Sequence, residues 1–324
     1  MDGITQRATI PTPRIIANPN LWSQFVGEIF KWRRHLLYQW FVGAPFIFAT
    51  VAALGMLLSP ARPDYSGIDS QVVGVVGMAG APIYALGSVG AFAIAGQIMI
   101  SGFLPMFAVG FALLAGWCVY SEFNWRTIKM VASRQPNRAY VVLSKVLFVA
   151  VMACTSFVTI TLSWLLLAMF FKVLFGAPFG LTPQDVEVIG LNATHLALRC
   201  LAMFLWALPT MAAVYSVKAV TGGVVIYLVY SGIDGLLSTL GATATNMPQA
   251  YMSAESFYQT IIEIARNAYP YLLTSHLNRL TMLPTSPQVV ASLPMGGSWV
   301  AVGLYVIAFV ALALLIFVPR DIKE

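Results

Sequence analysis

The chain has 324 residues, of which 59% are hydrophobic and only 9% charged, whereas a soluble globular domain carries roughly 25% charged residues. The net charge of +6 comes from basic residues beside apolar runs rather than in one aromatic-rich patch, which argues against nucleic acid as a partner. This composition predicts an all-α integral membrane protein, because a helix satisfies its own backbone amides within lipid. Without linkers or repeats, residues 1–324 are expected to form a single transmembrane domain.

The N-terminal region predicts an interfacial helix followed by a first span. In residues 20–37, large apolar side chains recur at near-helical spacing: Leu21, Phe25, Ile29 and Trp32. Charged side chains, Glu28 among them, are placed mostly elsewhere around this helix, which is typical of a helix lying along a membrane. No small-residue cleavage site follows, so residues 1–40 are expected to stay as a cytoplasmic tail and interfacial helix. Residues 41–58 carry no charge and predict the first span.

Residues 70–121 hold no charge and have room for one span or two. The basic cluster that follows belongs on the cytoplasmic side by the positive-inside rule, and this favours a single crossing. We therefore expect the second span at residues 98–120. The Gly-rich residues 72–96 are expected to be interfacial or re-entrant and buried against protein, with an extra span as the open alternative.

Four further apolar runs complete a predicted six-span bundle over residues 41–318. The remaining spans are expected at residues 144–171, 195–216, 222–240 and 298–318. Between them the sequence predicts an outer loop at 172–194, a tight turn after Lys218 and a long outer segment at 241–297. That segment contains one amphipathic pattern, with Phe257, Ile261, Ile264 and Ala268 on a shared face.

The distribution of basic residues supports this topology. Five of the 18 Lys and Arg fall on the outer side, namely Arg62, Lys172, Arg199, Arg266 and Arg279. The other thirteen fall on the cytoplasmic side, so both termini, including the tail at 319–324, are expected in the cytoplasm.

The densest polar stretch, residues 122–145, connects the second and third predicted spans. Glu122 and Arg126 are four residues apart, a spacing that stabilises a helix, and Pro136 is expected to end that helix. The pattern predicts a short crossbar helix across the ends of the spans. The plainer alternative is a basic loop that simply obeys the topology rule.

This stretch resembles the type-2 permeases of ABC exporters. In that family a glutamate ends the second span, and a Gly-Thr pair, an apolar stretch, a Pro-x-x-Arg-like element and a lysine follow. The matching residues here are Glu122, Thr127, Ile128, Pro136, Arg138 and Lys145. The order of amphipathic helix, spans, crossbar and outer segments also agrees loosely. Arg126 replaces the usual glycine, and the outer segments are longer than expected.

The resemblance implies that the crossbar is a coupling helix seated on a separate ATP-binding ABC subunit. The coupling residues would be Glu122, Arg126, Thr127, Ile128, Lys129, Arg134, Pro136 and Arg138. ATP and Mg²⁺ would bind that subunit, and no cofactor is expected in this chain, which has no G-x-x-x-x-G-K-[ST] motif. A second permease copy, identical or a close paralogue, membrane lipids and a bacterial-type plasma membrane are also implied. The transport pathway would lie between the two permeases, with spans two and five as its walls, and a lipid-like or amphipathic cargo fits such apolar walls.

Arg199 and Asp234 are the most deeply placed ionisable residues within the predicted spans. Both lie one to two turns from the outer ends of antiparallel helices and are expected to meet across the hairpin. Such a pair serves either as packing between helices or as a contact for substrate.

Other function classes find less support in the sequence. The three histidines and three cysteines show no metal-binding spacing, and the spans lack the clustered groups that an intramembrane enzyme needs. No catalytic residue and no metal ligand is therefore expected. A membrane scaffold or assembly subunit without a transport cycle is the alternative function, and it predicts that the crossbar tolerates alteration.

Overall fold

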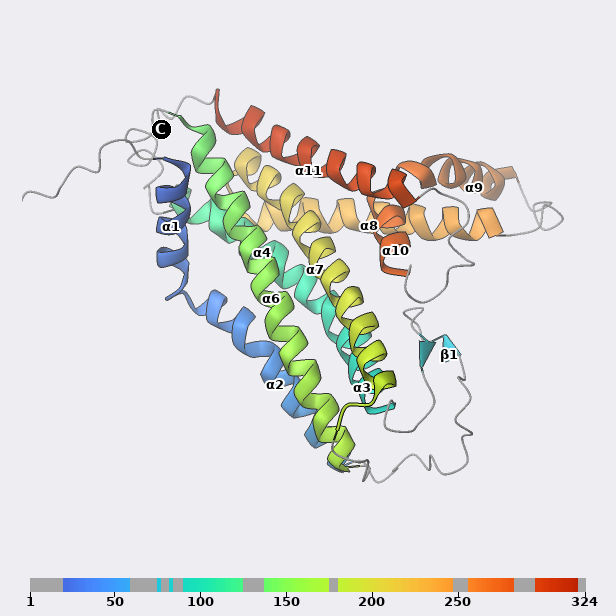
Figure 1. Cartoon of the computed structure of the whole chain (residues 1–324). Coiled ribbons are helices and arrows are strands. Elements are labelled where there is room, and N and C mark those ends of the chain that lie inside the picture. The colour runs from blue at the N-terminus through green and yellow to red at the C-terminus, as the bar shows by residue number, and fades with distance from the viewer. Residues whose placement is uncertain are drawn as a thin grey trace, which may run out of the picture.

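Long helices dominate the described part of the chain (Figure 1). The structure is a computed structural model that describes residues 20–58, 75–76, 82–83, 90–124, 137–174, 180–246, 256–282 and 295–319. Within these ranges the only strands are β1 (Val75–Val76) and β2 (Pro82–Ile83), which pair antiparallel. This short hairpin falls in the Gly-rich stretch, and the residues around it lie outside the described ranges.

The first two helices meet at a sharp break. Helix α1 (Leu21–Trp32) begins at Asn20, whose side chain accepts a hydrogen bond from the Ser23 amide at 2.8 Å. Helix α2 (Leu36–Leu58) follows after three residues and corresponds to the first predicted span. Helix α1 packs against α6 and buries Phe25, Glu28 and Trp32. The expectation that Glu28 lies away from the apolar face was therefore wrong.

The second predicted span is the end of a longer helical run. Helix α3 (Gly90–Gln97) passes directly into a π-helix, η1 (Ile98–Phe103), and then into α4 (Leu104–Asn124). The π-helix ends just before Pro105, which has no amide hydrogen to donate, so the local hydrogen-bond pattern must change there. Residues 90–96 continue this run and pack against α6 and α7, in agreement with the expectation that they are buried against protein.

Helices α6 (Ala139–Leu174) and α7 (Pro183–Val217) form the longest hairpin of the bundle. The expected outer loop at 172–194 was largely wrong, because α7 already begins at Pro183. A capping box starts it: the Thr182 hydroxyl accepts from the Asp185 amide and the Asp185 carboxylate accepts from the Thr182 amide. Beside this start, Lys172 Nζ lies 2.8 Å from Asp185 Oδ2 and 2.6 Å from the Gly180 carbonyl.

The turn from α7 to α8 (Val220–Asn246) is as tight as the sequence predicted. Lys218 ends α7 in the left-handed conformation, with φ of 56°, and donates its amide to the Val214 carbonyl. The two helices approach so closely that a β-carbon on Gly223 would lie 2.3 Å from Val214 Cγ2. A glycine is therefore required at this crossing.

Residues 241–297, predicted to lie on the outer side, contain more helix than the one amphipathic pattern predicted. Helix α9 (Ser256–Ala268) packs against α8, where a β-carbon on Gly241 would lie 2.8 Å from the Ala265 carbonyl. A 3₁₀ turn, η3 (Tyr269–Tyr271), leads into α10 (Leu273–Met282). Of the expected apolar face of α9, Ile264 is exposed, while the adjacent Ala265 is fully buried.

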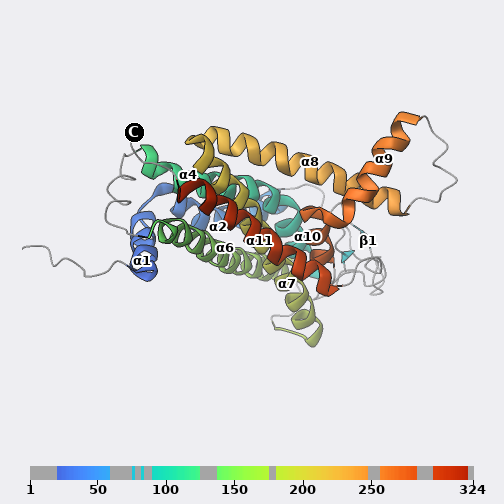
Figure 2. The same cartoon turned by 90° about the horizontal axis from the view of Figure 1, so that it is seen from above.

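The last helix, α11 (Met295–Phe317), packs against α7 and α10. Viewed from above, α4 lies inside the bundle, with α8 on one side and α6 on the other (Figure 2). Its core position agrees with the burial of Phe111, Leu114 and Cys118. The main core joins side chains from α1 to α7 with the end of α11.

Five of the described helices are long and apolar enough to cross a membrane: α2, α6, α7, α8 and α11. They correspond to the first, third, fourth, fifth and sixth predicted spans. Only 17% of the span in α11 and 22% of those in α2 and α8 are buried, so their apolar faces point out of the bundle. The chain is thus an α-helical, multi-pass membrane protein.

Candidate functional site

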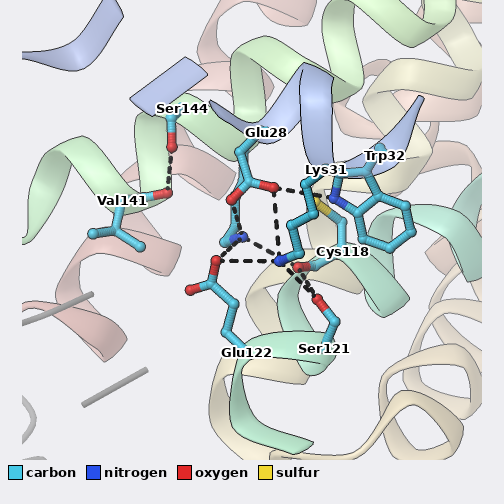
Figure 3. A network of polar contacts seen from close by, with 9 residues as sticks. Glu28, Lys31, Trp32, Cys118, Ser121, Glu122, Val141 and Ser144 are labelled. Carbon is cyan, nitrogen blue, oxygen red and sulfur yellow. Dashed lines mark hydrogen bonds and ion pairs between the residues drawn. The ribbon is translucent and has the colours of Figure 1, made fainter. Parts of the chain in front are cut away.

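A cluster of four charged side chains, three of them buried, lies where α1, α4 and α6 meet. It comprises Glu28 and Lys31 of α1, Glu122 of α4 and Lys145 of α6, and we call it the ion cluster. Figure 3 shows the Lys31 side chain of α1 pointing toward Glu122 and Ser121 of α4, with Trp32 beside Glu28. The cluster joins the last turn of α4 to the first turns of α6, so it brackets the predicted crossbar.

Lys145 is the centre of the ion cluster. Its ammonium Nζ lies 2.7 Å from Glu28 Oε1 and 2.8 Å from Glu122 Oε1. It also donates to the Cys118 carbonyl at 3.2 Å. The Lys145 side chain is fully buried, and Glu28 and Glu122 are 8% and 4% exposed. All three hydrogens of the ammonium thus have acceptors, which a buried lysine requires.

The periphery of the ion cluster fixes the two carboxylates further. Lys31 Nζ lies 3.5 Å from Glu122 Oε1 and donates to Ser121 Oγ at 3.3 Å. Trp32 donates its indole N–H to Glu28 Oε2 at 3.0 Å. Since Lys31 is partly exposed, it contributes less than Lys145 to the energy of the cluster.

The charges of the ion cluster cancel, with two carboxylates and two ammonium groups. Burial alone raises the pKa of Glu28, but the nearby ammonium groups of Lys145 and Lys31 more than compensate, so its pKa is lowered. Glu28 therefore stays ionised in the folded protein at neutral pH. Charges this deeply buried require such compensation.

The lowered pKa of Glu28 predicts a loss of stability in acid. Because the folded pKa lies below the ordinary value of 4.5, the stabilisation is complete above that value and is lost as pH falls through the folded pKa. Thermal unfolding in detergent between pH 7 and pH 3 should show Glu28→Gln less stable than wild type at pH 7. The difference should shrink toward pH 3. A difference that does not vary with pH would contradict the assignment.

The structure describes two of the predicted coupling residues, Glu122 and Arg138. Glu122 belongs to the ion cluster, and Arg138 donates through Nη1 to the Val318 carbonyl at 3.3 Å, linking the start of α6 to the end of α11. The other coupling residues lie outside the described ranges: Arg126, Thr127, Ile128, Lys129, Arg134 and Pro136.

The sequence pattern pointed to two of the four residues of the ion cluster but predicted none of its ion pairs. Glu122 and Lys145 were singled out by the family pattern, but nothing in that pattern paired them with each other or with α1. The spacing of Phe25, Glu28 and Trp32 places all three on one helix face. A glutamate between two large apolar residues on that face indicates that the carboxylate is buried and paired with a cation.

Arg199 and Asp234, predicted to pair within the membrane, form no ion pair in the part of the chain that the structure describes. Both carboxylate oxygens of Asp234 accept from the start of α10, Oδ1 from the Leu273 amide at 3.2 Å and Oδ2 from the Thr274 amide at 2.8 Å. These amides belong to the first turn of a helix, which favours a carboxylate through its unpaired N–H groups and its dipole. Asp234 therefore anchors α10 to α8.

Asp234→Leu is expected to destabilise the α8–α10 contact by about 1–2 kcal/mol, because two amides lose their acceptor. Hydrogen exchange of the amides of Leu273 and Thr274 should accelerate. The matched control is Asp234→Asn, which keeps one acceptor oxygen and should lose less. Equal protection of these amides in the leucine variant and wild type would rule out the anchoring role.

Arg199 lies on α7 without the ion pair that the sequence predicted for it. Its Nε and the Nε2 of His195, one turn earlier, are buried and lack a hydrogen-bond partner within the described ranges. Within the described ranges, no group of three or more His, Cys, Asp or Glu side chains could hold a metal ion.

Comparison of the chain with protein-family models, curated proteins and solved structures finds no match.

Proposed function

We propose that this chain is the membrane-spanning permease subunit of an ATP-driven ABC exporter. The observation that carries the proposal is the ion cluster, which binds both helices flanking the predicted crossbar to the interfacial helix α1. A displacement applied to the crossbar would then move α1, α4 and α6 together. A transporter needs such a rigid connection where an ATP-binding subunit transmits its closure to the spans.

The proposed topology has six spans, with α4 and the preceding η1 as the second. Both termini are cytoplasmic, in a bacterial-type plasma membrane, and the ion cluster lies at the cytoplasmic border. ATP and Mg²⁺ bind the partner subunit. The exposed apolar faces of α2, α8 and α11 provide surface for lipids and for a second permease copy, identical or paralogous.

The proposed cargo is lipid-like or amphipathic. Apolar helices form the walls of the bundle, and Arg199 is a cation without a paired acid within the described ranges. Ionisable side chains at such depth are costly and mark functional positions by default. An anionic group on the cargo would pair with Arg199, which Asp234 does not do.

The proposal is tested by purifying the tagged chain in mild detergent from its native host and identifying its partners by mass spectrometry. We expect a stoichiometric subunit with a P-loop, and we expect Arg126→Glu in the predicted crossbar to lose it. The matched control is Lys218→Glu, a charge reversal of an exposed lysine in the α7–α8 turn, which should keep the partner.

Two results would decide against the permease. Isolation of the chain without any ATP-binding partner would contradict coupling to ATP hydrolysis. Stoichiometric partners without a P-loop, retained in Arg126→Glu, would indicate the membrane scaffold instead.

A further inference from the structure

An apolar groove lies between α11 and the η3–α10 segment, along α11 and away from the ion cluster. Its volume is about 490 Å³, within the range of roughly 300–1,000 Å³ that is usual for small-molecule sites. Lining residues include Tyr271, His276, Ser298, Ala301, Leu304 and Ala308. The groove is therefore large enough for a ligand and is built from two separate parts of the chain.

Hydrogen bonds hold the two walls of the groove together. The Tyr305 hydroxyl donates to the Tyr271 carbonyl, and His276 Nδ1 lies 3.3 Å from Ser298 Oγ. Asp234 in turn fixes the start of α10 to α8, as described above. The groove is thus formed before any ligand arrives, which lowers the cost of ordering on binding.

The groove is polar at one end and apolar along its length. His276 and Ser298 form the polar end, close to the start of α11. From Ser298 to Ala308 the helix rises about 15 Å, at 1.5 Å for each residue. Between these ends its α11 wall consists of the aliphatic residues Val300, Ala301 and Leu304 and the aromatic ring of Tyr305. This shape matches an extended hydrocarbon chain that ends in a group able to form hydrogen bonds.

The groove opens away from the helix bundle, on the exposed face of α11 where a bilayer would lie. It follows α11, a candidate span of which only 17% is buried. Val300 and Leu304 on its rim are 64% and 60% exposed, and an apolar surface at this depth is covered by hydrocarbon. Lipid chains are the apolar molecules present there at high concentration.

We infer that this groove binds one acyl chain of a bilayer phospholipid, with the ester and headgroup region at His276 and Ser298. The inference goes beyond the proposed transport function and does not rest on it, because it concerns a lipid bound by the chain whether or not an ATP-binding subunit is attached.

The test uses the full chain reconstituted into phosphatidylcholine vesicles in which one acyl chain carries a photoactivatable diazirine. After illumination, labelled peptides are located by mass spectrometry. We expect labelling concentrated on residues 270–276 and 297–308. Ala301→Trp should fill the groove and reduce this labelling at least fivefold.

The matched control is Gly303→Trp, because a side chain at Gly303 extends into open space and this residue does not line the groove. Photolabelling of the Gly303→Trp variant should equal that of wild type. Should Ala301→Trp fail to fold by size exclusion and thermal unfolding, Ala308→Phe narrows the groove from its exposed rim and should likewise reduce labelling.

Two outcomes would overturn the inference. One is labelling spread evenly over the exposed faces of α2, α8 and α11 and unchanged by Ala301→Trp. The other is protection of residues 297–308 by a second copy of the chain, seen as chain-to-chain cross-links at the groove and as loss of the dimer in Ala301→Trp.

Discussion

Lys145→Met is expected to destabilise the folded chain by about 3–5 kcal/mol, the usual cost of removing one partner from a buried ion pair. Glu28 and Glu122 would lose the ammonium that lies 2.7 and 2.8 Å from them and would remain buried as like charges. The free energy of unfolding, measured by denaturant titration in mixed micelles, should fall accordingly. Helix α1 should also become more accessible to protease, because its buried carboxylate is no longer compensated.

Two variants separate a charge effect from a loss of packing. Lys31→Met removes the partly exposed lysine of the same cluster and should cost about 0–1 kcal/mol. The triple variant Glu28→Gln, Glu122→Gln and Lys145→Met should recover most of the stability, because the only charge left in the cluster is that of Lys31, which is partly exposed to solvent. If the triple variant were as unstable as Lys145→Met alone, packing rather than charge would explain the loss.

Lys172→Met is expected to cost a similar amount, about 3–5 kcal/mol, at the far end of the α6–α7 hairpin. Lys172 and Asp185 are 1% and 0% exposed, and the lysine Nζ also lies 5.1 Å from the centre of the Phe92 ring. Its removal leaves the Asp185 carboxylate buried at the start of α7. Unfolding in mixed micelles and hydrogen exchange of residues 183–187 would both report the loss.

The matched control for this end of the bundle is Lys218→Met, which removes an exposed lysine from the other hairpin turn and should change stability by less than about 0.5 kcal/mol. Adding Asp185→Asn to Lys172→Met should restore part of the stability. Indistinguishable unfolding of Lys172→Met and Lys218→Met would show that this ion pair contributes nothing net.

The apolar runs of the sequence predicted most of the long helices, because a bilayer crossing requires a long uninterrupted apolar segment. Polar extensions of these helices were harder to predict. The first three turns of α7 contain Asp185 and Glu187, and their polarity suggested a loop. The sequence nevertheless carries the start signal, a threonine followed by proline and, three residues after the threonine, an aspartate.

Pairings between distant elements were less predictable than the elements themselves. An antiparallel hairpin brings Arg199 and Asp234 to similar depth, but depth does not determine which way each side chain points. Asp234 is paired with backbone amides instead. Every residue except proline carries such an amide, so no residue type in the sequence marks this partner. Similarly, the π-helix before Pro105 depends on the backbone hydrogen bonds around it, and apolar periodicity cannot reveal it.

The ion cluster also imposes an order on the assembly of the protein during synthesis. Glu28 and its central partner Lys145 are 117 residues apart, whereas Glu122 and Lys145 are separated by only 23. As the ribosome produces the chain from its N-terminus, Glu28 must stay hydrated until α6 emerges. Glu122 waits for the same lysine, but its shorter loop costs less entropy to close, so the α4–α6 pair is expected to form before α1 docks.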